Sequence, residues 1–359
     1  MKCKANDAEG VPFSLPRSKY YNANDWLPVY ERLERVVELK EAMDFIRSED
    51  SRSKAPLVDG SMTDYLPTRR LALPVNKDNA IASGIVKPED RDLMVDTVYL
   101  NITSSSLDKS QMMILDLLAN FDWKRPIAFT QVYVLQELGL LDYLQFDGYS
   151  YRLVPILTPY KNSWEIGRID PDYVYPLMMN TFRYGNLADE DVYVDYFTQY
   201  NLGVSRARES FARVAKEYIR RGENEKAIEL LDRGLEVLPT SQIRYTEANT
   251  YPFIEAYYAI AEGEKGDALL IDYAEVLIEY IEHYLRFEGA GADLVSGILD
   301  EKFDELSQLY YLAGLAQRYD IVAQFNEYYL SFGADEEDLI KLPEDYKPKA
   351  TPIMKTIEE

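Results

Sequence analysis

The stretch RESFARVAKEYIRRGENEKAIELLDRGLEVLP, residues 208–239, contains two helical patterns separated by Gly222. In each half, apolar residues recur at intervals of three or four, which is typical of one buried helix face. The first half supplies Phe211, Val214, Ala215 and Tyr218; the second supplies Ala227, Leu231 and Gly234 and is followed by Pro239. A glycine at the turn and a proline after the second helix are common stop signals. The stretch therefore predicts a helical hairpin.

The alternation of large and small residues in this hairpin matches a tetratricopeptide repeat, which is a helix-turn-helix unit of 34 residues. A small residue on each helix lets the two backbones approach, and large residues fill the groove that remains. Two further helical pairs follow, and they match the repeat less closely: 251–262 with 267–287, and 301–316 with 320–332. Three stacked pairs form a continuous core. Because such arrays scaffold and bind, we expect no catalysis from them.

The chain divides into four predicted regions. Residues 1–24 form a frayed segment, 25–170 a small mixed α/β domain, 171–335 a helical tetratricopeptide-like array, and 336–359 a loose tail. In the α/β domain the patterns predict helices over 25–46 and 110–120. They predict strands over 65–75, 95–102, 126–134 and 149–156, with Pro67 and Pro74 keeping the first of these at a sheet edge. The fold class is thus α+β, mostly α.

The composition excludes several classes of function. Acidic residues outnumber basic ones 62 to 39, and a net charge of −23 disfavours nucleic acid, whose phosphates attract basic surfaces. No apolar run reaches the ~18 residues of a membrane helix, so we expect no direct lipid insertion by this chain. With Cys3 and His283 the only residues of their kinds, no multi-thiolate or multi-histidine metal site is possible. The phosphate-loop, nucleophile-elbow and zinc-protease motifs are also absent. We therefore expect no cofactor and no metal.

Tyrosine is unusually frequent, with 30 residues, several of them adjacent in pairs such as Tyr257-Tyr258 and Tyr310-Tyr311. A phenol ring offers a rigid apolar face with a polar tip, which suits recognition of glycans, peptides or partner proteins. Alternatively, the tyrosines fill the interior of the helix pairs and keep their hydroxyls at the rim.

Four segments resemble a known family: Tyr65–Arg69, Trp123–Phe129, Leu138–Pro155 and Phe182–Asn186. They are similar to the soluble C-terminal region of large bacterial membrane proteins, once a domain of unknown function and now grouped with GT-C-type glycosyltransferases. The resemblance covers roughly Trp26–Pro239. It implies a module that follows a multi-pass membrane enzyme, on the extracytoplasmic (periplasmic) face of the inner membrane. In GT-C enzymes the catalytic carboxylate lies between membrane helices, a portion this chain lacks, so no catalytic residue is carried over.

Residues within the matched segments are candidate ligand-binding groups. Aromatic and guanidinium planes near strand ends can stack on or clamp a ligand. The candidates are Trp123, Arg125, Asp142, Tyr143, Tyr149, Tyr151 and Arg152. The alternative is structural: Arg125 and Arg152 pair with Asp142 or Asp147 and tie strands to loops.

The expected function is a non-catalytic accessory module of a membrane glycosyltransferase-like protein. It is tethered through the membrane portion of that parent protein and positions a glycan or protein acceptor. One alternative is a stand-alone tetratricopeptide-type scaffold that binds proteins, which composition alone would place in the cytoplasm. Another is a carbohydrate-active enzyme with two carboxylates about 5–10 Å apart across a cleft.

Overall fold

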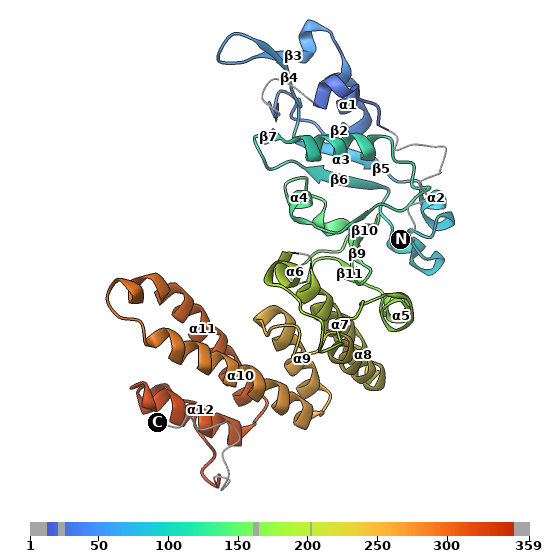
Figure 1. Cartoon of the computed structure of the whole chain (residues 1–359). Helices are drawn as coiled ribbons and strands as arrows, with labels where there is room; N and C mark the ends of the chain where they lie inside the picture. The colour runs from blue at the N-terminus through green and yellow to red at the C-terminus, as the bar shows by residue number, and fades with distance from the viewer. Residues whose placement is uncertain (1–12, 21–25, 161–164, 202, 348–359) are drawn as a thin grey trace. The chain divides into compact units, whose positions relative to one another are not determined.

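The computed structural model describes residues 13–20, 26–160, 165–201 and 203–347. The chain forms two compact units, Met1–Asp170 and Pro171–Glu359, which we call the N-terminal and C-terminal units (Figure 1). The N-terminal unit contains small sheets with short helices, and the C-terminal unit consists of packed helix pairs. The predicted fold class, a mixed α/β region followed by helical hairpins, is confirmed. No helix in the described ranges is long and apolar enough to span a bilayer.

A three-stranded sheet organises the N-terminal unit. Its order is β2 (Val37–Glu38), β5 (Arg70–Pro74), β6 (Thr97–Asn101), with β5 parallel to β2 and antiparallel to β6. Alternate residues of β5 and β6, such as Leu71 and Leu100, are buried, as the period-two pattern of a half-buried strand predicts. Helices α1 (Leu39–Arg47) and α3 (Lys109–Ala119) pack together, and α1 also contacts β5.

Three further sheets complete the unit, all built from very short strands. One is four-stranded, in the order β11 (Arg168–Ile169), β9 (Leu144–Phe146), β10 (Tyr151–Leu153), β8 (Ala128–Phe129). The other two pair β1 (Leu27–Pro28) with β7 (Ser106–Leu107) and β3 (Lys54–Pro56) with β4 (Met62–Asp64). Short helices lie between them: η1 (Arg17–Tyr20), η2 (Ser51–Ser53), α2 (Lys77–Ala82), η3 (Pro88–Leu93), α4 (Tyr133–Gln136) and η4 (Leu141–Tyr143).

Three sequence predictions for this unit are wrong in part. The helix expected over 25–46 exists only from Leu39, because the chain before it pairs with distant segments: the Val29 amide donates to the Ser105 carbonyl. Strand β5 lies in the centre of its sheet, and Pro74 is tolerated because β2 pairs only with Leu71 and Ala72 and therefore leaves the β2 side of Pro74 unpaired. Of the strand expected over 126–134, only Ala128–Phe129 is extended.

Other predictions hold. Helix α3 begins where Asp108 and Gln111 form a reciprocal cap: the Asp108 carboxylate accepts from the Gln111 amide at 2.8 Å, and the Gln111 side chain accepts from the Asp108 amide at 2.9 Å. Strands β6 and β10 lie within the predicted extended segments.

Asp116, on α3, anchors the start of the described chain. Its fully buried carboxylate accepts from the Ser14 and Leu15 amides, the Ser14 hydroxyl, the Tyr20 hydroxyl and the Asn120 side chain. The sequence predicts fraying over 1–24; of that segment the structure describes 13–20, where Leu15 and Tyr20 are buried. A buried carboxylate is costly unless its lone pairs are satisfied, and here the donors come mainly from a segment about 100 residues away.

The C-terminal unit is a series of helices whose neighbours in sequence pack together. They are α5 (Pro171–Pro176) with the π-helical turn Leu177–Thr181, α6 (Tyr196–Asn201), α7 (Val204–Arg220), α8 (Asn224–Val237), α9 (Glu247–Ala259), α10 (Gly263–Leu285), α11 (Ala290–Leu315) and α12 (Tyr319–Ser331). Helix α7 packs on α8 and α9, α9 on α10, α10 on α11, and α11 on α12 (Figure 1). The hairpin predicted over 208–239 corresponds to α7 and α8.

Close packing in this hairpin depends on Gly234. A Cβ there would lie 2.9 Å from the Phe211 ring and 3.0 Å from the Phe253 ring. Since real Cβ contacts are longer, glycine is what allows α7, α8 and α9 to approach.

Six tyrosines of this unit follow the filler pattern. Their rings pack between helices while their hydroxyls donate to carboxylates: Tyr257 to Asp232 at 2.9 Å, and Tyr258 to Asp267 at 2.9 Å. The same arrangement recurs in four further pairs: Tyr218 with Asp172, Tyr245 with Asp272, Tyr175 with Glu229 and Tyr273 with Glu305. At these positions the tyrosines therefore fill the interior between helices, with their hydroxyls at the rim, which is the second of the two interpretations of the sequence.

Candidate functional site

The candidate residues from the sequence lie in two places within the N-terminal unit. Trp123 and Arg125 follow α3, whereas the other five lie on or beside strands β9 and β10. Trp123 and Arg152 are nevertheless attached to the same turn after α2. The Ser83 hydroxyl donates to the Trp123 carbonyl at 2.9 Å, and the Arg152 guanidinium donates to the Gly84 carbonyl at 2.7 Å.

Trp123 is held in an unusual backbone conformation. Its φ is +64°, a left-handed value that costs a bulky residue about 1–3 kcal/mol. Its indole N–H donates to the Pro74 carbonyl at 2.8 Å, and its ring lies 4.6 Å from that of Phe121. Only 1% of the residue is exposed, so its ring serves as packing and offers no open face for stacking. Arg125 is exposed.

A hollow of about 430 Å³ adjoins Trp123. It is lined by Pro74, Val75, Asn76, Lys77, Asp78, Asp96, Phe121, Asp122 and Trp123. Half-buried Phe121 supplies aromatic surface, while the three carboxylates are exposed to solvent. The lining comes from the end of β5, the start of α2, the approach to β6 and the end of α3, which are distant in sequence.

Each carboxylate at the hollow pairs with a nearby cation. Asp78 lies 2.8 Å from Arg91, Asp96 lies 2.7 Å from Lys77, and Asp122 lies 2.7 Å from Lys124. The hydrogen bond from Lys124 holds the pKa of Asp122 below its usual value. Ionised carboxylates are pure hydrogen-bond acceptors, so this rim suits a ligand that presents hydroxyl or amide donors.

Arg152 is held in a buried ion pair. Only 7% of it is exposed, and its Nε lies 2.9 Å from the Asp147 carboxylate, whose Oδ1 also accepts from Gln145 at 3.1 Å. Burial raises the pKa of Asp147, while the neighbouring Arg152 acts in the opposite direction. Together with the bond to Gly84, this ion pair ties β10 to the turn after α2. The structural interpretation of the sequence expects Arg152 to pair with Asp142 or Asp147, and the structure shows the pair with Asp147.

The remaining candidates do not line the hollow. Tyr143 is buried, and the Asp142 carbonyl accepts from the Thr158 amide at 2.7 Å. The Tyr151 ring packs 5.2 Å from that of Phe146, and Tyr149 is 44% exposed. Of the seven, only Trp123 belongs to the lining. A ligand-binding role for the other six stays a prediction.

The sequence reasoning missed most of the lining residues. Asn76 carries a local signal, because its side chain caps α2 by accepting from the Asn79 amide at 3.0 Å. Asp96, Phe121 and Asp122 carry none, since only the tertiary fold brings them together. Within the described ranges no group of three or more His, Cys, Asp or Glu side chains is placed to hold a metal ion.

The comparisons with known proteins give one match. Residues 1–173 are similar to the family described as TMEM260-associated domain 2. The match spans three of the four segments that carry the sequence resemblance and ends before 182–186. No curated protein and no solved structure matches the chain. The match covers the N-terminal unit and specifies no activity.

Proposed function

We propose that this chain is a non-catalytic binding module of a membrane glycosyltransferase-like protein, and that it positions a glycan or protein acceptor on the extracytoplasmic side. The similarity of residues 1–173 to a TMEM260-associated domain supports the link to a larger assembly. The resemblance found in the sequence supports the glycosyltransferase context and the tether to a membrane portion.

The observation that favours binding over catalysis is that each carboxylate at the hollow is paired with a cation. Two-carboxylate hydrolysis of a glycoside needs one acid kept protonated by a raised pKa. Here Asp78, Asp96 and Asp122 each lie beside a cation, and the pKa of Asp122 is lowered. Ionised carboxylates beside an aromatic surface instead suit sugar hydroxyls and the C–H face of a sugar ring.

Binding and transfer assays on the purified chain test this proposal. We expect a glycan array to show binding that Asp96→Asn with Asp122→Asn weakens at least tenfold, because two charged acceptors become neutral amides. Glu34→Gln, at an exposed position outside the lining, is the matched control and should bind normally. With a lipid-linked sugar as donor, the chain alone should transfer nothing. Transfer that the double variant abolishes would show an enzyme instead.

The link to a membrane portion has its own test. We expect the coding region upstream of Met1 to continue in frame through apolar segments of ~20 residues each. A stop codon followed by a ribosome-binding site would contradict the tether and favour a cytoplasmic protein.

Close packing of α7, α8 and α9 around Gly234 favours a second candidate, a tetratricopeptide-type scaffold for proteins. Peptide-library selection on the full chain distinguishes the two functions. Peptide binding that survives the double substitution at the hollow would support the scaffold, whereas glycan binding lost with it supports the module proposed above.

A further inference from the structure

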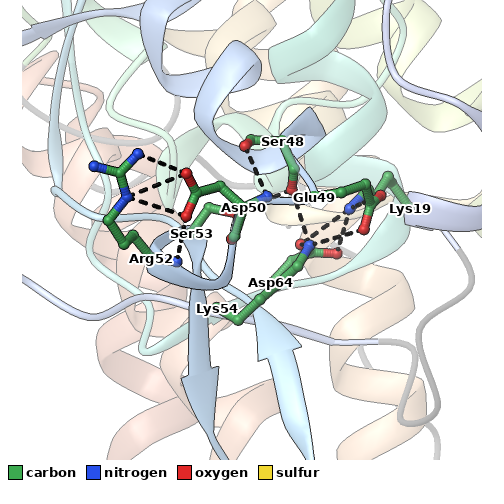
Figure 2. A network of polar contacts seen from close by, with 8 residues as sticks. All are labelled: Lys19, Ser48, Glu49, Asp50, Arg52, Ser53, Lys54 and Asp64. Atoms are coloured by element: carbon green, nitrogen blue, oxygen red, sulfur yellow. Dashed lines mark hydrogen bonds and ion pairs between the residues drawn. The ribbon is translucent and has the colours of Figure 1, made fainter.

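Two lysines of the N-terminal unit share one largely buried carboxylate. Lys54 on β3 and Asp64 on β4 are directly opposed across the strand pair, and their charged groups are 2.5 Å apart. The Lys19 ammonium lies 3.1 Å and 3.2 Å from the two oxygens of the same carboxylate. Side-chain exposure is 6% for Lys19, 16% for Lys54 and 15% for Asp64. Figure 2 shows the three side chains converging beside the strands.

A fourth group, Glu49, reaches this cluster from solvent. Its carboxylate lies 2.8 Å from the Lys19 ammonium and 3.4 Å from that of Lys54, yet its side chain is 78% exposed. The turn that carries it is fixed by its neighbours, because Ser53 and Lys54 both donate to the Ser48 carbonyl at 2.9 Å (Figure 2). Glu49 is thus a solvated carboxylate on a fixed turn, in contact with two largely buried cations.

Charge counting shows what Glu49 does there. Two ammonium groups and Asp64 leave one positive charge, which Glu49 balances. Each ammonium has three donors; Lys54 directs them to Asp64, Ser48 and Glu49, and Lys19 to Asp64 and Glu49. Without Glu49, one donor from each lysine would face solvent on the same side. Ion pairs with so exposed a partner contribute little stability, so another anion can replace Glu49.

We propose that Lys19 and Lys54 bind a singly charged phosphate group of an external molecule, and that Glu49 occupies this site in its absence. One negative charge balances the cluster, and the several acceptor oxygens of a phosphodiester can bridge two ammonium groups. The source is either a soluble phosphodiester or a phospholipid headgroup. The net charge of −23 disfavours an anionic membrane surface, so we expect the soluble form to bind better. This proposal is independent of the function proposed for the hollow.

NMR titration of the full chain with dimethyl phosphate, followed at the lysine ammonium and side-chain signals, tests the site at constant ionic strength. We expect saturable shifts at Lys19 and Lys54. Glu49→Gln should tighten binding about tenfold, because it removes a competing charge a few ångströms away. Lys54→Gln should weaken binding by a similar factor. The two substitutions have opposite expected signs, so misfolding of one variant leaves the other decisive.

The matched control is Glu41→Gln, which removes an exposed carboxylate that pairs with Arg35 at 2.7 Å. It should leave the affinity for dimethyl phosphate unchanged. Vesicles of phosphatidylglycerol, compared with phosphatidylcholine, identify the source: binding that depends on Lys54 supports the site with a lipid headgroup as its ligand. Absence of saturable shifts at both lysines, in the unmodified chain and in Glu49→Gln, would overturn the proposal.

Discussion

The two units are stabilised in different ways. In the N-terminal unit, decisive contacts join residues far apart in sequence: Asp116 with Ser14, Arg152 with Gly84, and Trp123 with Pro74. In the C-terminal unit, each long helix packs on helices that lie one or two places away in sequence. The comparison teaches that in the first unit buried polar anchors tie distant segments together around an apolar core, whereas in the second unit repeated contacts join helices that are close in sequence.

Removing the Asp116 anchor should have the largest effect. Asp116→Ala leaves the buried donors of Ser14, Leu15 and Tyr20 without an acceptor, so we expect the N-terminal unit to lose roughly 3–5 kcal/mol of unfolding free energy. All tryptophans of the sequence precede residue 171, so their fluorescence during urea unfolding reports this unit. Far-UV circular dichroism reports mainly the helices of the other. Asp92→Ala, at an exposed position, is the control. An equal loss of unfolding free energy by fluorescence and by circular dichroism would contradict the idea that Asp116 stabilises the N-terminal unit alone.

The C-terminal unit also contains a buried polar anchor, Arg208. It is 1% exposed and donates to the Leu238, Pro239 and Ile243 carbonyls at 2.9–3.0 Å, while burial lowers its pKa to about 10. Arg208→Met should cost about 2–4 kcal/mol, because these carbonyls lose their donors. Circular dichroism during urea unfolding measures it, with the partly exposed Arg233→Met as control. A smaller loss of unfolding free energy than in Arg233→Met would show that water takes over the hydrogen bonds of the Arg208 guanidinium to these carbonyls.

Glycine substitutions sharpen the comparison at smaller scale. Gly234→Ala should cost about 1–3 kcal/mol, because its Cβ would press on the Phe211 and Phe253 rings. Gly297→Ala, inside α11 with nothing within 4 Å of its Cβ, should instead stabilise by about 0.5–1 kcal/mol. The melting temperatures of the helical transition should therefore move in opposite directions. Shifts of the same sign would refute the role given to Gly234.

The smallest expected effect is a pH dependence at Asp172. A hydrogen bond from Arg221 lowers the pKa of this half-exposed carboxyl. Its stabilisation is present above the unfolded pKa near 3.8 and is lost as pH falls through the lower folded value. Solvent screening limits it to at most about 0.5 kcal/mol. Asp172→Asn should flatten the unfolding free energy of the C-terminal unit between pH 5 and 2, measured by urea unfolding. An unchanged dependence of the unfolding free energy on pH would show that the Asp172–Arg221 pair does not contribute to stability.

How far the sequence predicts the fold follows from this contrast. The 208–239 hairpin and the later helix pairs are predictable because their signal is local and repeats every three or four residues. The helix wrongly expected over 25–46 has apolar residues at similar spacing, but Leu33 and Val36 are exposed and Val29 pairs with a distant loop. Periodicity alone could not reveal that partner. Of the residues that line the hollow, the sequence singles out Trp123 as a candidate but none of Asp78, Asp96 and Asp122, because carboxylates are frequent throughout this acidic chain.

Alkaline solution should destabilise the helical region. Burial raises the pKa of Tyr218, Tyr257 and Tyr258 above the ordinary value of 10.0, and their hydroxyls already donate to carboxylates. The unfolded chain releases these protons near pH 10 while the folded chain retains them, so the unfolding free energy falls as pH rises beyond that point. Phenolate absorbance from these rings should therefore grow together with helix loss and not before it, which makes their ionisation an optical signal of unfolding.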